Sequence, residues 1–316
     1  MVDPYVLGTI CGLFSAVVYT CANAFLRAVH TSDPVWVSAV KAVPTVLTMG
    51  PVVALMAWRG QKIIPSFRML AAIGLGGLIG QLGGNIAFQW ALSQVGLALT
   101  VPLSLGGMIL AAAVFGRMFL YEPVTPKAAV ALGLLLAAIL VLFVGAKDAS
   151  VTLAEAPVPI WRLVGGVAAA CLCGVAYASL NVILRYCITR GAPLPTTLFT
   201  VSLTGLLALG LISWLRIGHR GMLETSSREL ALMLGAGLCN TVAFISLTKS
   251  LQLTTVVYVN ALNATQATLA ALAGVLIFGE ALSPWLASGV GLTIAGLMCL
   301  AHAHRAMREP IAMTAD

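Results

Sequence analysis

The sequence predicts an all-α integral membrane protein of ten transmembrane helices, arranged as two inverted five-helix repeats. Composition, a regular series of apolar stretches and an internal repeat all lead to this fold class. Hydrophobic residues make up 60% of the chain, charged residues only 9%, and the mean hydropathy is +1.02. A soluble domain carries about 25% charged residues, so this chain cannot cover a water-facing surface. The lipid bilayer is therefore its expected surrounding and partner.

Ten apolar stretches follow one another with short breaks, each near the roughly 20 residues that span about 30 Å of hydrocarbon. The predicted spans are residues 5–27, 35–57, 69–92, 97–119, 127–146, 163–186, 195–215, 229–250, 253–278 and 284–303. The longest break is too short for a soluble domain. We therefore expect a first repeat over 1–146, a linker over 147–162, a second repeat over 163–304 and a cytoplasmic tail over 305–316.

Polar residues recur at one step of 158 residues, which is half of the 316 in the chain. Five residues of the first half have an identical residue 158 positions later. The earlier set is Tyr19, Asn23, Arg27, Glu122 and Pro126, and the later set, in the same order, is Tyr177, Asn181, Arg185, Glu280 and Pro284. Five helices are an odd number of crossings, so the second copy is inverted relative to the first. Inverted duplication is typical of many secondary transporters, because it builds a site that can open to either side.

The basic residues set the predicted orientation. With the N-terminus inside, ten Lys and Arg residues lie on the cytoplasmic side and six outside. The positive-inside rule thus favours a multi-pass protein of the cytoplasmic membrane with both termini in the cytoplasm. The basic residues are scattered over loop ends, so no nucleic-acid partner is expected.

Polar side chains form stripes on several predicted helices, spaced by three or four residues and so sharing a helix face. The substrate-binding candidates are Tyr19, Asn23, Lys41, Gln81, Asn85, Tyr177, Asn181, Asn240, Tyr258, Asn260, Asn263 and Gln266. Buried amides can hold helices together or contact a ligand. For a single Asn both interpretations stand, whereas the whole set favours a shared polar cavity.

Lys41 is the one strong charge well inside a predicted span, and no Asp or Glu lies in the middle of any span. A buried ammonium costs about 2.5–3.5 kcal/mol on insertion scales. It could bind a carboxylate or phosphate of a substrate, or pair with helix-end carbonyls. The lack of a buried carboxylate favours neutral, zwitterionic or anionic substrates.

Two short turns carry Glu122 with Pro126 and Glu280 with Pro284, and we expect these residues to act as structural turns. Thr125 and Ser283 precede the prolines as N-caps would. Motifs of metalloproteases, P-loop enzymes and serine hydrolases are missing, so we expect no enzyme, no cofactor and no metal site. The seven cysteines fit apolar packing.

The segments 119–126 (Phe-Leu-Tyr-Glu-Pro-Val-Thr-Pro) and 277–284 (Ile-Phe-Gly-Glu-Ala-Leu-Ser-Pro) each close a predicted fourth helix. With the ten spans in two copies, the chain resembles the drug/metabolite transporter superfamily, in particular EamA-type exporters. The resemblance implies a central cavity lined by helices 1, 3, 4, 6, 8 and 9. That group typically has an Arg on helix 2 where this chain has Lys41.

We therefore expect a secondary transporter, most simply an exporter, that moves a small polar metabolite such as an amino acid by alternating access. Lys41 would attract a negative group of the substrate. A channel-like or lipid-translocating protein and a membrane-embedded sensor without net flux are the alternatives. The oligomeric expectation is a monomer or homodimer.

Overall fold

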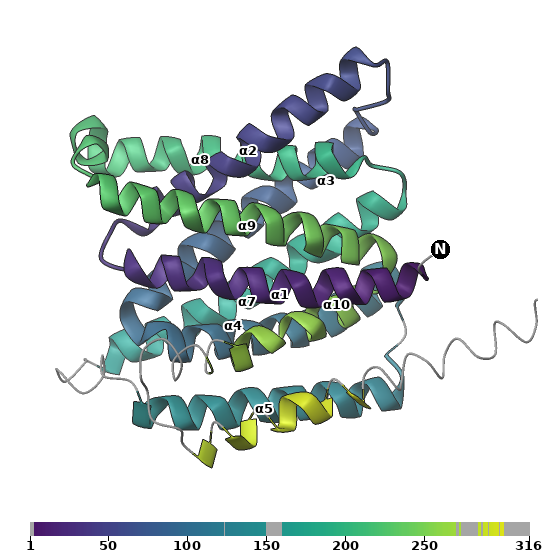
Figure 1. Cartoon of the computed structure of the whole chain (residues 1–316), viewed down its shortest axis with the longest axis vertical. Helices are drawn as coiled ribbons and strands as arrows, with labels where there is room; N and C mark the ends of the chain where they lie inside the picture. Colours follow the sequence, from purple (N-terminus) through teal and green to yellow (C-terminus); the bar gives the residue numbers. More distant parts are fainter. Residues whose placement is uncertain are drawn as a thin grey trace, which may run out of the picture.

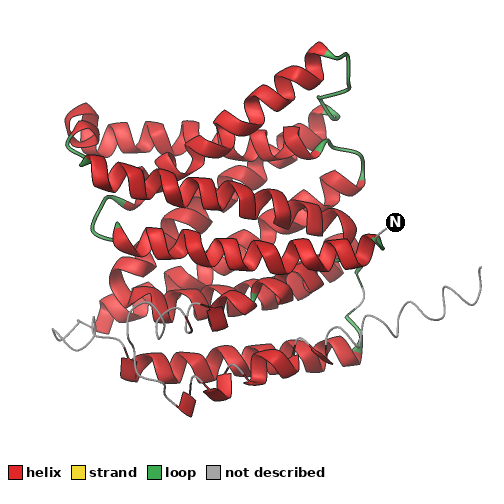
Figure 2. Cartoon of the chain, in the orientation of Figure 1, coloured by secondary structure: helices red, strands yellow, loops and turns green. Residues whose placement is uncertain are grey.

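The computed structural model describes residues 3–122, 124–149 and 160–269, together with 272, 284–285, 287–289, 291–296 and 298–299. Within these residues all regular secondary structure is helical (Figure 2). The first half contains α1 (Pro4–Ala28), α2 (Pro34–Trp58), α3 (Phe67–Leu78), the π-helix η1 (Ile79–Ile86), α4 (Ala87–Leu120) and α5 (Pro126–Ala149). The second half contains α7 (Ile160–Thr189), α8 (Leu194–Leu223), α9 (Ser227–Leu253) and α10 (Val256–Asn263).

Seven helical stretches in the described part are long and apolar enough to cross a membrane. They are Pro4–Ala28, Pro34–Trp58, Phe67–Val95, Thr100–Leu120, Val164–Thr189, Leu194–Leu223 and Ser227–Leu253. Each overlaps one predicted span. The shorter apolar helix Pro126–Val141 overlaps the predicted fifth span, the described helical residues 287–289 and 291–296 lie within the tenth, and α10 begins the ninth. The chain is thus an all-helical, multi-pass membrane protein.

Residues with short polar side chains start several of these helices. Asp33 accepts hydrogen bonds from the backbone N–H groups of Val35 and Trp36 at the start of α2. Ser226 and Glu229 form a reciprocal capping box on α9. Thr125 accepts from Ala128 N at 3.2 Å before Pro126 opens α5, which confirms the predicted N-cap. Such caps satisfy N–H groups that the first helical turn leaves free.

Two helices reach into the predicted linker over 147–162, because α5 continues to Ala149 and α7 already begins at Ile160. An apolar helix can continue beyond the hydrocarbon layer, and composition alone does not mark the residue at which the helix ends. Residues 150–159, the tail 305–316, Glu280 and Ser283 lie outside the described residues.

Although α4 is described as one helix, it contains the end of the third predicted span, 69–92, and the whole of the fourth, 97–119. Up to Val95 the chain runs back along α7, with Gly84 against Tyr177 and Val95 against Gly166. After residue 100 it runs forward again, because Glu122, beyond the end of α4, meets Arg185 near the end of α7. The third and fourth spans therefore cross in opposite directions, as predicted.

The helices lie side by side with their connections gathered at two ends of the bundle (Figures 1 and 2). α1 packs along α9, and α2 packs along α8. Both pairs join the first half to the second, and both are antiparallel, since Gly8 meets Leu253 and Gly50 meets Phe199. In Figure 1 α5 lies at one edge of the bundle.

The polarity of the molecule is inverted relative to a soluble protein. Large apolar side chains such as Leu47, Leu110 and Leu207 are more than half exposed, whereas Lys41 and Asn181 are buried. Lipid accommodates an apolar exterior, and polar side chains gain partners only inside the bundle. The fold therefore concentrates its polar groups around a central space.

Candidate functional site

A cavity lies between the helices of the two halves and offers about 130 Å³ to the centres of water-sized molecules. One water needs roughly 10–15 Å³ on this measure, so there is room for a small ligand or several waters. Eight of the ten predicted spans contribute to its described lining, namely the first to fourth and the sixth to ninth. The described side chains of α5 do not contribute to it.

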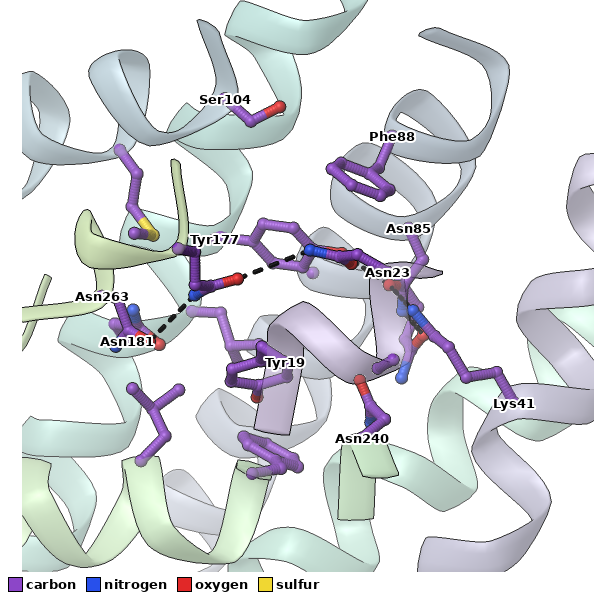
Figure 3. A pocket seen from close by; sticks show the side chains of 18 of the residues that line it. Tyr19, Asn23, Lys41, Asn85, Phe88, Ser104, Tyr177, Asn181, Asn240 and Asn263 are labelled. Atoms are coloured by element: carbon purple, nitrogen blue, oxygen red, sulfur yellow. Dashed lines mark hydrogen bonds between the residues drawn. The ribbon is translucent and has the colours of Figure 1, made fainter. Parts of the chain in front are cut away.

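Ten of the twelve predicted substrate-binding residues line this cavity. They are Tyr19, Asn23, Lys41, Gln81, Asn85, Tyr177, Asn181, Asn240, Asn263 and Gln266. Figure 3 shows most of them converging on the cavity from separate helices. The helical spacing of polar residues therefore predicted which faces turn inward, while a role in substrate binding remains a prediction.

Tyr258 and Asn260 do not line the cavity. The Tyr258 hydroxyl hydrogen-bonds Thr9 Oγ1 at 3.1 Å, and its ring packs on Tyr5 with centroids 5.1 Å apart. Asn260 accepts a hydrogen bond from Asn181 Nδ2 at 2.7 Å. Because a three-residue stripe drifts round a helix, Asn260 faces α7 whereas Asn263 and Gln266 reach the cavity. Both residues join helices in this structure.

Asn85 is the centre of a hydrogen-bonded cluster at one side of the cavity. The Lys41 ammonium, on a side chain only 6% exposed, donates to Asn85 Oδ1 at 2.5 Å. The Tyr177 hydroxyl donates to the same oxygen at 2.5 Å. Asn85 Nδ2 in turn donates to Gln81 Oε1. Among the described lining residues Lys41 is the only charged one, and no described acidic group pairs with it.

Gln81 and Asn85 are carried by the π-helix η1, where sequence periodicity predicted a regular α-helix. Gly80, Gly83 and Gly84 weaken the α-helical preference of this segment. A side chain at Gly84 would lie 2.6 Å from the Tyr177 ring, so the glycine allows η1 to approach α7 closely. π-helical segments are frequent at functional sites. The density of glycines is the feature of the sequence that could have indicated the π-helix.

A second group of amides links α1 and α7 to the helix that starts with α10. Asn263 Oδ1 accepts from Ser15 Oγ at 3.2 Å and from Gln266 Nε2 at 3.0 Å. Asn23 Nδ2 reaches Gln266 Oε1 at a long 3.5 Å. These amides thus satisfy one another across helices, as the helix-joining interpretation expects.

Several lining residues were not predicted as site residues. Phe88, Leu105, Met108 and Leu180 form apolar walls, and Ser202 contributes from α8. Apolar wall residues cannot be told from lipid-facing ones by composition in a chain this hydrophobic. The positions of Lys41 on α2 and Ser202 on α8 also add two helices to the six that the family resemblance implies.

Polar contacts join the two halves at one end of the bundle. We call it the N-terminal end, because α1 begins there. Glu122 Oε1 lies 3.5 Å from Arg185 Nε, and Glu122 Oε2 accepts from Val256 N at 3.0 Å. Arg185 also donates to Leu251 O at 2.6 Å and Gln252 O at 3.0 Å. Glu122 and Arg185 thus connect α4, α7, α9 and α10.

Glu122 therefore does more than hold its own turn. Tyr121, at the end of α4, has a left-handed backbone with φ of 56°, and the chain turns there. The Glu122 carboxylate then reaches the second half instead of its neighbours in sequence. Burial raises the pKa of this carboxyl, while Arg185 and the N–H of Val256 counteract the rise. Pro126 opens α5 as predicted.

Comparison with known proteins agrees with the second half of this architecture. Residues 164–301 match the model of the EamA-like transporter family. No curated protein matches the chain. One crystal structure is similar with a TM-score of 0.71 at 19% sequence identity, covering 93% of this chain and 96% of that one. At this identity the likeness concerns the fold alone.

Proposed function

We propose that the chain belongs to the EamA-like transporter family, a family of small-molecule membrane transporters, because residues 164–301 match the model of that family, in agreement with the resemblance noted in the sequence. From this premise we propose that the protein is a secondary transporter in the cytoplasmic membrane. It moves a small polar metabolite, neutral, zwitterionic or anionic, by alternating access of two inverted five-helix halves. The observation that carries the proposal is a polar cavity walled by both halves, with an ion pair joining the halves at the N-terminal end.

The directions of equivalent helices support the inversion. Helices α1 and α7 carry the recurring Tyr and Asn, yet α1 begins where α7 ends. The contacts of Thr9 with Tyr258 and of Glu122 with both Val256 and Arg185 bring these two ends together. Copies that run in opposite directions can exchange conformations, which exposes one site to each side in turn.

The contacts at the N-terminal end support a gated carrier over an open pore. Ser250 Oγ donates to Gly8 O at 2.7 Å, beside the contact of Glu122 with Arg185. A permanent channel would need a water path here. Export as the working direction and cytoplasmic termini follow from the family resemblance and the positive-inside rule.

The test is exchange in proteoliposomes containing the purified protein. Vesicles are loaded with amino acids, hydroxy acids or sugar phosphates, and uptake of the same labelled compound is measured. A carrier shows uptake accelerated by substrate on the far side. Flux without such acceleration would indicate a channel, and ligand-induced stabilisation without flux would indicate a sensor.

The inverted arrangement has a separate test. Single cysteines replacing Glu122 and Glu280 are labelled with a membrane-impermeant thiol reagent, in a background without the seven native cysteines. Inversion predicts labelling from opposite compartments. Labelling of both from one compartment would contradict the inverted halves and the carrier that depends on them.

A further inference from the structure

The hydrogen bonds inside the cavity separate amides that hold helices together from groups that are available to a ligand. Asn85, Asn181, Asn263 and Gln266 each bond another side chain within the bundle. Of the amide and phenol side chains in the lining, Tyr19 and Asn240 alone make no hydrogen bond with the described residues. Figure 3 shows both beside the cavity.

Asn240 faces the cavity next to Lys41, because α9 crosses α2 at this level. A Cβ atom on Gly237 would lie 2.7 Å from Lys41 O, and Thr241 Oγ1 hydrogen-bonds Thr45 Oγ1 at 2.8 Å. Asn240 lies one turn beyond Gly237, and Lys41 one turn before Thr45. The two side chains thus enter the cavity from facing helices.

Lys41 also keeps hydrogen-bonding capacity. An ammonium group has three donors, and the one side-chain bond of Lys41 goes to the neutral Asn85. A positive charge that is 6% exposed and compensated only by an amide is costly, and an anionic ligand group would offset the cost. The described lining holds no carboxylate that could bind a ligand ammonium.

Resting on the proposed function, we propose that Lys41, Asn240 and Tyr19 form the substrate subsite, and that the substrate is a small organic oxyanion with a neighbouring hydroxyl. One anionic oxygen accepts from Lys41 Nζ and a second from Asn240 Nδ2. The Tyr19 hydroxyl bonds the neutral hydroxyl of the ligand. On the order of ten non-hydrogen atoms fit, judging from the space that single waters need.

The test uses four related probes: glycerate, glycerol 3-phosphate, serine and glycerol. Thermal unfolding of the purified full-length protein in detergent is followed with each probe at equal concentration. A ligand that prefers the folded state raises Tm, by an amount set by its concentration relative to Kd. We expect glycerate or glycerol 3-phosphate to raise Tm, whereas serine and glycerol do not. The two anions distinguish a carboxylate from a phosphate as the bound group.

Two variants test the residues. Asn240→Leu keeps the side-chain size and should lower the affinity for the anion about 10–100-fold, because one hydrogen bond to a charged group is lost. Tyr19→Phe should lower the affinity for the same anion about fivefold. Ser246→Ala, at a half-buried residue of the same helix that does not line the cavity, is the matched control and should bind as the native protein does. A ligand-free Tm of Asn240→Leu near the native value shows that the variant folds.

Equal stabilisation by serine or glycerol, no stabilisation by either anion, or full binding by Asn240→Leu would each overturn the subsite. These outcomes are distinct from failure of the proposed function. If serine or another uncharged or zwitterionic compound is exchanged in proteoliposomes with far-side acceleration, the carrier stands and the oxyanion subsite is wrong.

Discussion

Replacing Glu122 by Gln should open the N-terminal end of the cavity. The substitution keeps the side-chain shape and an oxygen that can accept from Val256 N, but it removes the charge that faces Arg185 at 3.5 Å. The two side chains are only 11% and 20% exposed, so solvent screens the pair weakly. The contact lies between helices of different halves, and an inward opening at this end has to break it.

The structure sets the expected magnitude. Removing one partner of a buried ion pair costs about 3–5 kcal/mol. Arg185 retains Leu251 O and Gln252 O as acceptors, so the lower figure for a single hydrogen bond to a charged group, about 1.5–3 kcal/mol, is appropriate. Each 1.4 kcal/mol is tenfold, which shifts the closed-to-open ratio at this end by roughly 10–100-fold.

The assay is the rate at which an impermeant thiol reagent, added from the N-terminal side, labels a cavity cysteine. Leu247→Cys supplies the reporter, since Leu247 lines the cavity and lies on α9 two turns before its end. Glu122→Gln should raise the labelling rate by roughly 10–100-fold, as the closed-to-open ratio shifts. Glu224→Gln, the same change at an exposed residue ending α8, is the control.

An unchanged labelling rate in Glu122→Gln would refute the reasoning, because the pair would then contribute nothing to closure. A double change with Arg185→Gln gives a second check. If the residues act as a pair, the two single effects are not additive.

Three further predictions concern packing, the cavity and a helix cap. Gly174→Ala would place a Cβ atom 2.2 Å from Ser104 O and should cost about 1–3 kcal/mol of stability, measured as a lower Tm; Gly210→Ala, with nothing within 4 Å, should show no such loss. Lys41→Met should abolish uptake of an anionic substrate in vesicles while protein abundance stays unchanged, and undiminished transport would remove Lys41 from the mechanism. Ser226→Ala should cost about 1 kcal/mol and speed hydrogen exchange in the first turn of α9; unchanged exchange would show that the capping box adds no local stability.

Much of the candidate site was predictable because membrane helices impose a simple rule. Polar side chains avoid lipid, so Tyr19, Asn23 and Tyr177 had to face the interior, and regular helical spacing showed which faces those were. Helical spacing did not predict every detail. Gln81 and Asn85 reach the cavity from a π-helix instead of an α-helix, and Asn260, on a stripe of three-residue steps, turns toward α7 instead of the cavity.

The pairing of residues across helices could not be predicted. The sequence contained Glu122 and Arg185 at the ends of separate spans, yet it indicated only a local turn for Glu122. Their contact depends on the left-handed residue Tyr121 and on the way α4 lies along α7. Likewise, Asn85 and Asn240 have the same chemistry, and only their neighbours make Asn85 a helix-joining amide and leave Asn240 without a hydrogen bond to the described residues.

By itself, the sequence determined that this chain is a membrane protein, and it predicted two related halves and the side chains that avoid lipid. Those properties follow from hydropathy and helical period, which act along the chain. Tertiary structure alone decided which buried groups hydrogen-bond each other, which side chains line the cavity, and which contacts join the two halves at one end of the bundle. Such properties arise from contacts between helices remote in sequence, and no local pattern encodes them.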